Sequence, residues 1–104
     1  MTGFEDRQQG FEAKFAHDAN TEFRVMARRN KLAGLWAAKL LGFADAEAET
    51  YAKTIVQADF EEAGDEDVIR KLVADLQATD TSEATIREAL SGFLAEARAQ
   101  IEAR

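Results

Sequence analysis

The sequence of 104 residues contains no proline and no cysteine, and only six glycines. Proline interrupts a helix because it lacks the backbone N–H donor and its ring clashes with the preceding turn, so its absence permits long helices. Without cysteine, the chain cannot hold a disulfide, a thiolate zinc site or a cysteine nucleophile. The lack of cysteine also fits a reducing compartment, and we expect a cytoplasmic protein.

Residues typical of catalytic and cofactor sites are also scarce. His17 is the only histidine, and a single histidine beside an aspartate is in most cases a solvated side chain. The sequence has no glycine-rich phosphate loop and no pair of Glu-x-x-His elements that would form a di-metal bundle. Residues 65–67 are acidic but lack the ligand spacing of a calcium loop. We therefore expect no enzymatic activity, no metal and no cofactor.

Long hydrophobic runs are missing as well. No stretch approaches the ~20 apolar residues that cross a bilayer, so we expect no direct membrane insertion. The N-terminus lacks the apolar run of a signal peptide. The formal net charge of −7 argues against a general affinity for nucleic acid or anionic lipid.

The residues that the chain does contain are typical of helices. It is 46% hydrophobic and 32% charged, and Ala, Leu, Glu, Lys and Arg lose least on entering a helix. Start and stop signals predict four helical segments. They run from Asn20 or Thr21 to Leu41 with Gly42 as stop, from after Asp45 to Gly64, from near Asp65 to about Leu76, and from a capping box over Asp80–Glu83 to near the C-terminus.

Apolar residues recur at helical spacing within each segment, and the linkers are short, which makes successive helices antiparallel neighbours. The sequence thus predicts an all-α, four-helix bundle over residues 20–104. Trp36 is assigned to the core, and the second helix is expected to bury a face that ends at Phe60.

Residues 1–19, here called the arm, differ from the rest. Phe4, Phe11 and Phe15 are spaced by 7 and 4, so they share one stripe if the arm is helical. Burying three phenylalanines contributes ~5–9 kcal/mol, whereas ordering about fifteen residues costs roughly 15–30 kcal/mol. We expect a mobile arm that becomes helical on a partner. The alternative is that it packs along the bundle.

The first predicted helix of the bundle carries a concentration of positive charge. Residues 21–42 hold five basic residues and one acidic residue, while residues 43–64 hold one basic and six acidic residues. Arg24, Arg28 and Arg29 therefore have two interpretations: they pair with the acidic helices that follow, or they form a docking surface. Exposed ion pairs contribute only ~0–1 kcal/mol each, which explains such a cluster poorly.

The same helix carries a family resemblance. Residues 23–32 (Phe-Arg-Val-Met-Ala-Arg-Arg-Asn-Lys-Leu), with residues 35–42 (Leu-Trp-Ala-Ala-Lys-Leu-Leu-Gly), resemble the ζ subunit of alphaproteobacterial ATP synthases. Residues 4–7 (Phe-Glu-Asp-Arg) and 11–18 (Phe-Glu-Ala-Lys-Phe-Ala-His-Asp) are similar to the opening of that family. The resemblance covers essentially the whole chain.

The resemblance implies a natural inhibitor of ATP hydrolysis by the catalytic head of F-type ATP synthase. Its arm would become helical as it enters between a catalytic subunit pair and the central rotor stalk. The partner-contacting residues are then expected to be Phe4, Arg7, Phe11, Lys14 and Phe15 of the arm, with Arg24, Arg28 and Arg29 of the bundle. The free protein is expected to be a monomer.

Two other classes of function stay open on the sequence alone. A helical adaptor would bind a different acidic protein through its basic first helix. A nucleic-acid binder would contact phosphates through the same residues, although the acidic remainder and the missing aromatic platform argue against it.

Overall fold

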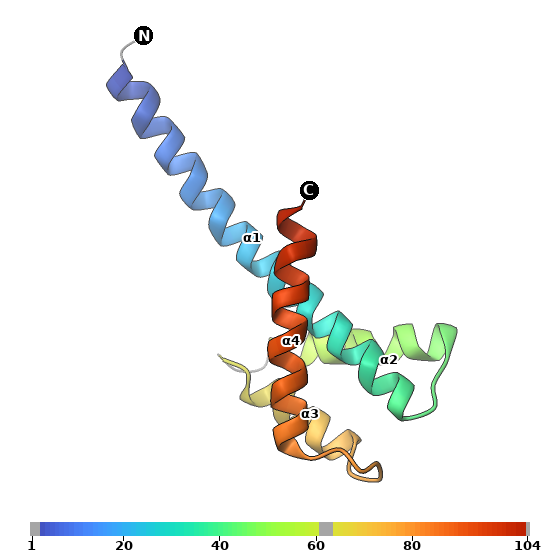
Figure 1. Cartoon of the computed structure of the whole chain (residues 1–104). Coiled ribbons are helices and arrows are strands. Elements are labelled where there is room, and N and C mark those ends of the chain that lie inside the picture. The colour runs from blue at the N-terminus through green and yellow to red at the C-terminus, as the bar shows by residue number, and fades with distance from the viewer. Residues whose placement is uncertain (1–2, 61–63, 104) are drawn as a thin grey trace.

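The computed structural model describes residues 3–60 and 64–103, and the side chains from residue 20 onward within these ranges. Four helices follow in order: α1 (Gly3–Leu40), α2 (Asp45–Ala58), α3 (Glu66–Asp75) and α4 (Glu83–Glu102) (Figure 1). No strand occurs within the described ranges. The predicted all-α fold of four helices joined by short loops is confirmed.

The first helix is much longer than predicted. α1 begins at Gly3 and runs for 38 residues, so the start predicted at Asn20 is wrong. Asn20 and Thr21 lie inside continuous helix, where neither can act as an N-cap, and no proline precedes them to break the helix. At 1.5 Å per residue such a helix measures about 57 Å. It therefore accounts for most of the 63 Å length of the molecule.

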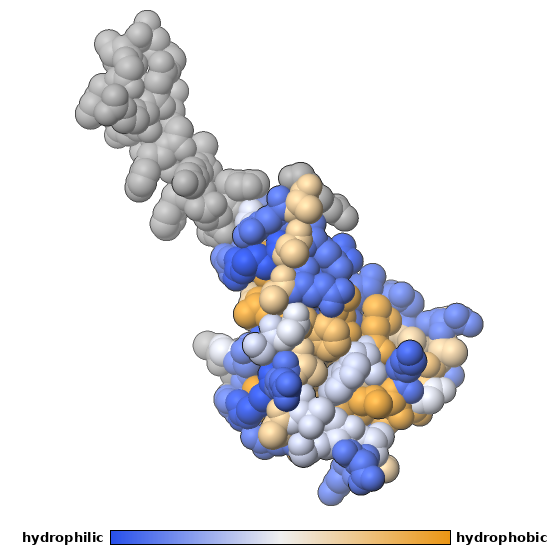
Figure 2. All heavy atoms as spheres, in the orientation of Figure 1, coloured by the Kyte–Doolittle hydropathy of each residue, from blue (hydrophilic) through white to orange (hydrophobic). Residues whose placement is uncertain are grey.

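The core forms where α1 lies between α2 and α4. Its main cluster joins buried residues of all four helices: Ala33, Ala37, Ile55, Val68, Ile69, Leu72, Leu76, Ile86 and Leu90. Trp36 packs against this cluster as predicted, with its ring centroid 6.0 Å from that of Phe93. At Gly34 the crossing of α1 and α2 leaves no room for a side chain. The face seen in Figure 2 is mostly hydrophilic, with apolar residues gathered beside α4.

The ends of the helices follow local chemistry in most places. Gly42 has φ +85° and ends α1 as predicted. The amides of Gly42 and Phe43 donate to the carbonyls of Lys39 and Ala38, which is the Schellman pattern. The cap of α4 is Ser82, whose hydroxyl accepts from the amide of Thr85 at 3.1 Å, and not the predicted Asp80.

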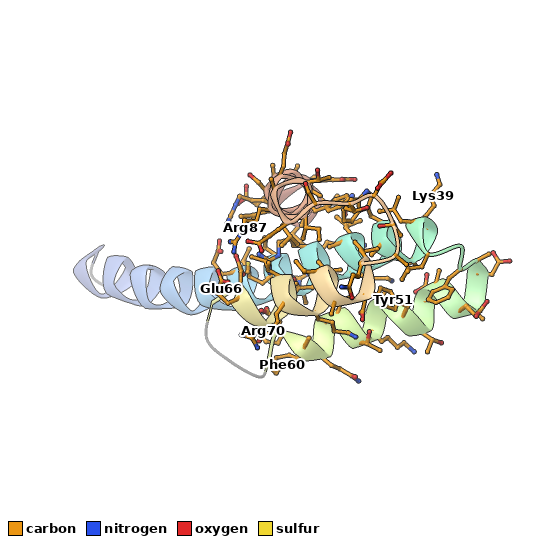
Figure 3. The ribbon with its side chains drawn as sticks, turned by 90° about the horizontal axis from the view of Figure 1, so that it is seen from below. Lys39, Tyr51, Phe60, Glu66, Arg70 and Arg87 are labelled. Carbon is orange, nitrogen blue, oxygen red and sulfur yellow. The ribbon has the colours of Figure 1, made fainter. Side chains whose placement is uncertain are left out.

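Two polar contacts hold α3 against its neighbours. The Tyr51 hydroxyl of α2 donates to Asp75 at 2.8 Å, and burial together with this bond raises the pKa of Tyr51. Arg87 of α4 reaches Glu66 at the start of α3, with a shortest distance of 3.3 Å (Figure 3). These contacts tie the short α3 to both α2 and α4.

Candidate protein-docking surface

The arm occupies the N-terminal half of α1. In Figure 1 this part of the helix extends beyond the ends of the other three helices. The predicted contact residues Phe4, Arg7, Phe11, Lys14 and Phe15 all fall on it. Their side chains lie outside the described part of the structure.

Residues 20–104 are here called the body. The C-terminal turns of α4 contact α1 at the point where this helix enters the body. Arg98 of α4 donates to both carboxylate oxygens of Glu22, and the Nη2–Oε2 distance is 3.1 Å. This bond lowers the pKa of Glu22 below its ordinary value of 4.5 and raises the pKa of Arg98. Beneath the pair, Val25 packs with Ala97 and Ile101 in a second, smaller apolar cluster. Glu22 and Val25 are therefore the points at which the described part of α1 contacts the C-terminal turns of α4.

Arg24 and Arg28 lie one turn apart on the outside of α1, and the side chain of Arg24 is exposed while that of Arg28 is half-buried. Within the described ranges neither arginine makes an ion pair, in contrast to Lys31 on the same helix, whose Nζ lies 3.8 Å from Glu49. No carboxylate of the described ranges therefore neutralises these two guanidinium groups, on a chain that is acidic overall. Such groups suit carboxylates supplied by another protein.

Arg29, the third arginine of the predicted surface, belongs to the interior. Its side chain is only 2% exposed, and its Nη1 donates to Asp65 at 2.9 Å. Its Nε and Nη2 both donate to Oδ1 of Asn30, at 3.0 and 2.7 Å. The buried guanidinium group thereby supplies hydrogen-bond donors to the buried amide oxygen of Asn30 and to the carboxylate of Asp65, the residue directly before α3. Arg29 is therefore not exposed to a partner protein. Of the two interpretations of the arginine cluster, pairing with the acidic part of the chain that follows applies to this residue.

Asn30 extends the same polar network to the end of α2. Its Nδ2 donates to Asp59 at 2.9 Å, and its side chain is almost completely buried. Among the described residues, no buried side-chain nitrogen or oxygen is left without a hydrogen-bond partner. The network thus joins the middle of α1 to both ends of the connection between α2 and α3.

An exposed aromatic pair lies beside this network and was not predicted. The side chains of Phe23 on α1 and Phe60 after α2 are 58% and 67% exposed, and their ring centroids are 6.1 Å apart. Phe60 was expected on the buried face of the second helix. That expectation is wrong because α2 ends at Ala58, so the helical periodicity no longer sets the direction of Phe60.

Two features, a metal-binding cluster and a membrane-spanning helix, are absent from the described ranges. These residues contain no group of three or more side chains that could hold a metal ion. None of the helices within them combines the length and hydrophobicity needed to span a bilayer. The features that the structure does bring together, an extended helix and a partly apolar, partly basic surface at its root, are those of a protein-binding module.

Comparisons with known proteins agree with this architecture and with the resemblance seen in the sequence. A family model described as ATPase inhibitor subunit zeta matches residues 1–100. Four chains of solved structures match as well. One of them, a solution NMR structure, is 49% identical, and the match covers 78% of this chain and 94% of that chain with a TM-score of 0.72. No curated protein matches. Because the family model spans nearly the whole sequence, the chain belongs to the family of ATPase inhibitor subunits zeta.

Proposed function

We propose that this chain inhibits ATP hydrolysis by the catalytic head of an F-type ATP synthase, and that its arm is the inhibitory element. The arm enters between a catalytic subunit pair and the central rotor stalk, where a helix obstructs rotation in the hydrolytic direction. Membership in a family named for ATPase inhibition supports the inhibitory role. The observation that carries the role of the arm is that the first half of α1 extends alone beyond the body (Figure 1).

The length of the extended segment suits insertion into a protein cleft. From Gly3 to Asn20 the helix advances about 26 Å at 1.5 Å per residue. Its predicted contact stripe of Phe4, Phe11 and Phe15 covers much of that length. A partner that encloses the stripe would bury its three aromatic side chains.

The body lowers the cost of making the arm helical. Starting a helix is unfavourable because several residues are fixed before the first hydrogen bond forms, whereas adding residues to an existing helix is nearly neutral. Packing against α4 at Val25 and the Glu22–Arg98 pair hold the next part of α1 as a helix. Helix formation in the arm therefore extends from an existing helix end, and a partner only has to stabilise the added turns.

The remaining contacts of the proposed complex involve charge. Arg7 and Lys14 of the arm and Arg24 and Arg28 of the body would meet carboxylates of the catalytic head. The protein reaches the membrane only through the enzyme to which it binds. It needs no cofactor and no nucleic acid, and it is a cytoplasmic monomer when free.

The test is ATP hydrolysis by an isolated alphaproteobacterial catalytic head from which endogenous inhibitor has been removed. The full chain is compared with a version that starts at Asn20. Both apolar clusters lie within residues 25–101, so the shorter chain is expected to fold, which far-UV circular dichroism verifies. Inhibition by the full chain alone supports the proposal, and absence of inhibition by the full chain in large excess contradicts it.

A second candidate function is a helical adaptor that binds a different acidic protein through the body. The observation that favours it is that Arg24 and Arg28 make no ion pair with any carboxylate in the part of the chain that the structure describes. An adaptor of this kind keeps its partner after the arm is removed. Retained binding to the catalytic head without inhibition would separate this role from the inhibitory one.

A further inference from the structure

The exposed aromatic pair forms a small defined surface at the root of the arm. Phe23 and Phe60, with Met26 and Val56, surround a hollow of about 30 Å³, and we call these four residues the aromatic patch. Figure 3 places Phe60 on the side of the body away from α4, toward the end from which the arm extends.

The patch is unusual among the exposed apolar residues of the described ranges. The large apolar side chains classed as exposed there are Phe23, Leu40, Phe60 and Val73. Of these, Phe23 and Phe60 are in ring contact with each other, with an angle of 34° between their planes. Two adjacent aromatic rings that are more than half exposed are typical of the centre of a protein interface.

The patch is held in place before any partner arrives. The hollow between its rings is also lined by Asn30 and Asp59, whose 2.9 Å hydrogen bond joins α1 to the end of α2. Arg29 in turn fixes the Asn30 amide through two bonds. The two phenylalanines, which come from different elements, are therefore positioned by the buried network beneath them. A surface arranged in advance loses little conformational entropy on binding.

The charge beside the patch indicates the chemistry of its partner. Arg24 follows Phe23 in the chain, and Arg28 follows Ala27, which lines the hollow, so both arginines belong to the same turns of α1 as the patch. Within the described ranges neither arginine is paired with a carboxylate. A complementary surface therefore offers apolar side chains flanked by acidic residues.

The position of the patch links it to the arm. Phe23 directly follows Glu22, which accepts a hydrogen bond from Arg98 of α4. Phe15 and Phe23 are eight residues apart on one continuous helix, or about 12 Å along its axis. A protein that encloses the arm to its root therefore comes within reach of the patch.

We infer that the aromatic patch, with Arg24 at its edge, is a second contact with the protein that receives the arm. It would dock on an apolar, acid-flanked surface of the catalytic head. This inference rests on the proposed function and extends it: the arm blocks rotation, while the patch anchors the body and slows dissociation.

The test uses the full chain with Phe23→Ser and Phe60→Ser combined. The matched control combines Leu40→Ser and Val73→Ser, which also remove exposed apolar side chains but lie apart from the patch. We expect the patch variant to need about tenfold or more protein for half-inhibition and to dissociate correspondingly faster. Inhibition at saturation should equal that of the unmodified chain, because the arm is intact.

A second variant keeps the test informative if serine at Phe23 or Phe60 disturbs folding, which thermal melting would reveal. Arg24→Glu alters no packed side chain and should weaken inhibition several-fold, with the difference shrinking at high salt. Lys53→Glu, an exposed change of the same charge on α2, is its control. Equal effects of the two reversals would overturn the role of Arg24.

The outcomes separate this inference from the proposed function. If the unmodified chain inhibits and the patch variant matches its control, the second contact is wrong and the inhibitory arm stands. If the unmodified chain does not inhibit, the proposed function fails and the inference fails with it. A patch variant that inhibits more strongly means that the patch holds the chain's own arm. Loss of a dimer in sedimentation experiments means that it joins two copies, and both results overturn the inference.

Discussion

Gly34 on α1 and Ala52 on α2 face each other so closely that a Cβ atom on Gly34 would lie 2.6 Å from the Cα atom of Ala52. Real Cβ atoms essentially never approach another atom to that distance. The neighbouring atom is backbone and cannot rotate away, so the crossing of the two helices depends on the missing side chain.

We predict that Gly34→Ala destabilises the protein. The substitution gains about 1 kcal/mol in helix propensity, but it forces α1 and α2 apart, and overpacking of this kind costs typically 1–3 kcal/mol. Gly92→Ala is the matched control, because nothing lies within 4 Å of a Cβ at that position on α4. It should stabilise by about 0.5–1 kcal/mol. Urea unfolding measures both, and a shift of the same sign for the two variants would contradict the role of the crossing.

Substitution of Arg29 tests the buried polar network. Arg29→Lys keeps the positive charge but loses the planar fork that reaches Asn30 and Asp65 together. Because Asn30 is fully buried, its oxygen loses donors that water cannot replace, and we expect a loss of about 1–3 kcal/mol in the free energy of unfolding. Asp65→Asn should cost less, since Asp65 is partly open to water. A lysine variant as stable as the unmodified chain would show that the fork is dispensable.

The pair of Glu22 and Arg98 predicts a dependence of stability on pH. The hydrogen bond from Arg98 lowers the pKa of Glu22 in the folded protein below 4.5. The stabilisation is therefore present above pH 4.5 and is lost as the pH falls through the lowered value. Comparison of the unmodified chain with Glu22→Gln should show a small difference at pH 7 that disappears in strong acid. Glu88→Gln, at an exposed position on α4, is the control. A difference that grows on acidification would contradict the assignment.

Substitutions in the arm should reduce inhibition and leave the fold intact. We expect Phe11→Ala with Phe15→Ala to raise the concentration for half-inhibition by at least tenfold, because aromatic anchors dominate such interfaces. The thermal unfolding midpoint should stay unchanged, since both apolar clusters lie in the body. Gln9→Ala, on the opposite side of the helix from Phe11, is the control. Unchanged inhibition by the double variant would remove the phenylalanines from the contact.

The fold was predictable where a single residue determines the backbone. Gly42 ends α1 through a left-handed conformation that other residues rarely adopt, and the sequence marks that position. The start of α1 was not predictable in the same way. Asn20 is a good N-cap only where the preceding residues leave the helix, and nothing in residues 3–19 forces them to leave.

The burial of Arg29 could have been predicted from its position in the helix, but its positive charge favoured an exposed interpretation. Arg29 is four residues from both Val25 and Ala33, which are completely buried, so it shares their face of α1. Its carboxylate partner comes from 36 residues away. Such a pairing depends on how the helices cross, which periodicity does not specify. The exposure of Phe60 depends likewise on where α2 ends.

Because α1 runs unbroken from the arm into the centre of the body, the orientation of the body about the helix axis is fixed relative to the arm. A residue inserted near position 20 would turn the body by about 100° about the helix axis and move it by about 1.5 Å. The arm would then keep its own contacts while the body faced another direction. The number of helical residues between the arm and the body therefore determines the orientation of the body about the helix axis. It decides which side of the bundle faces a surface that binds the arm.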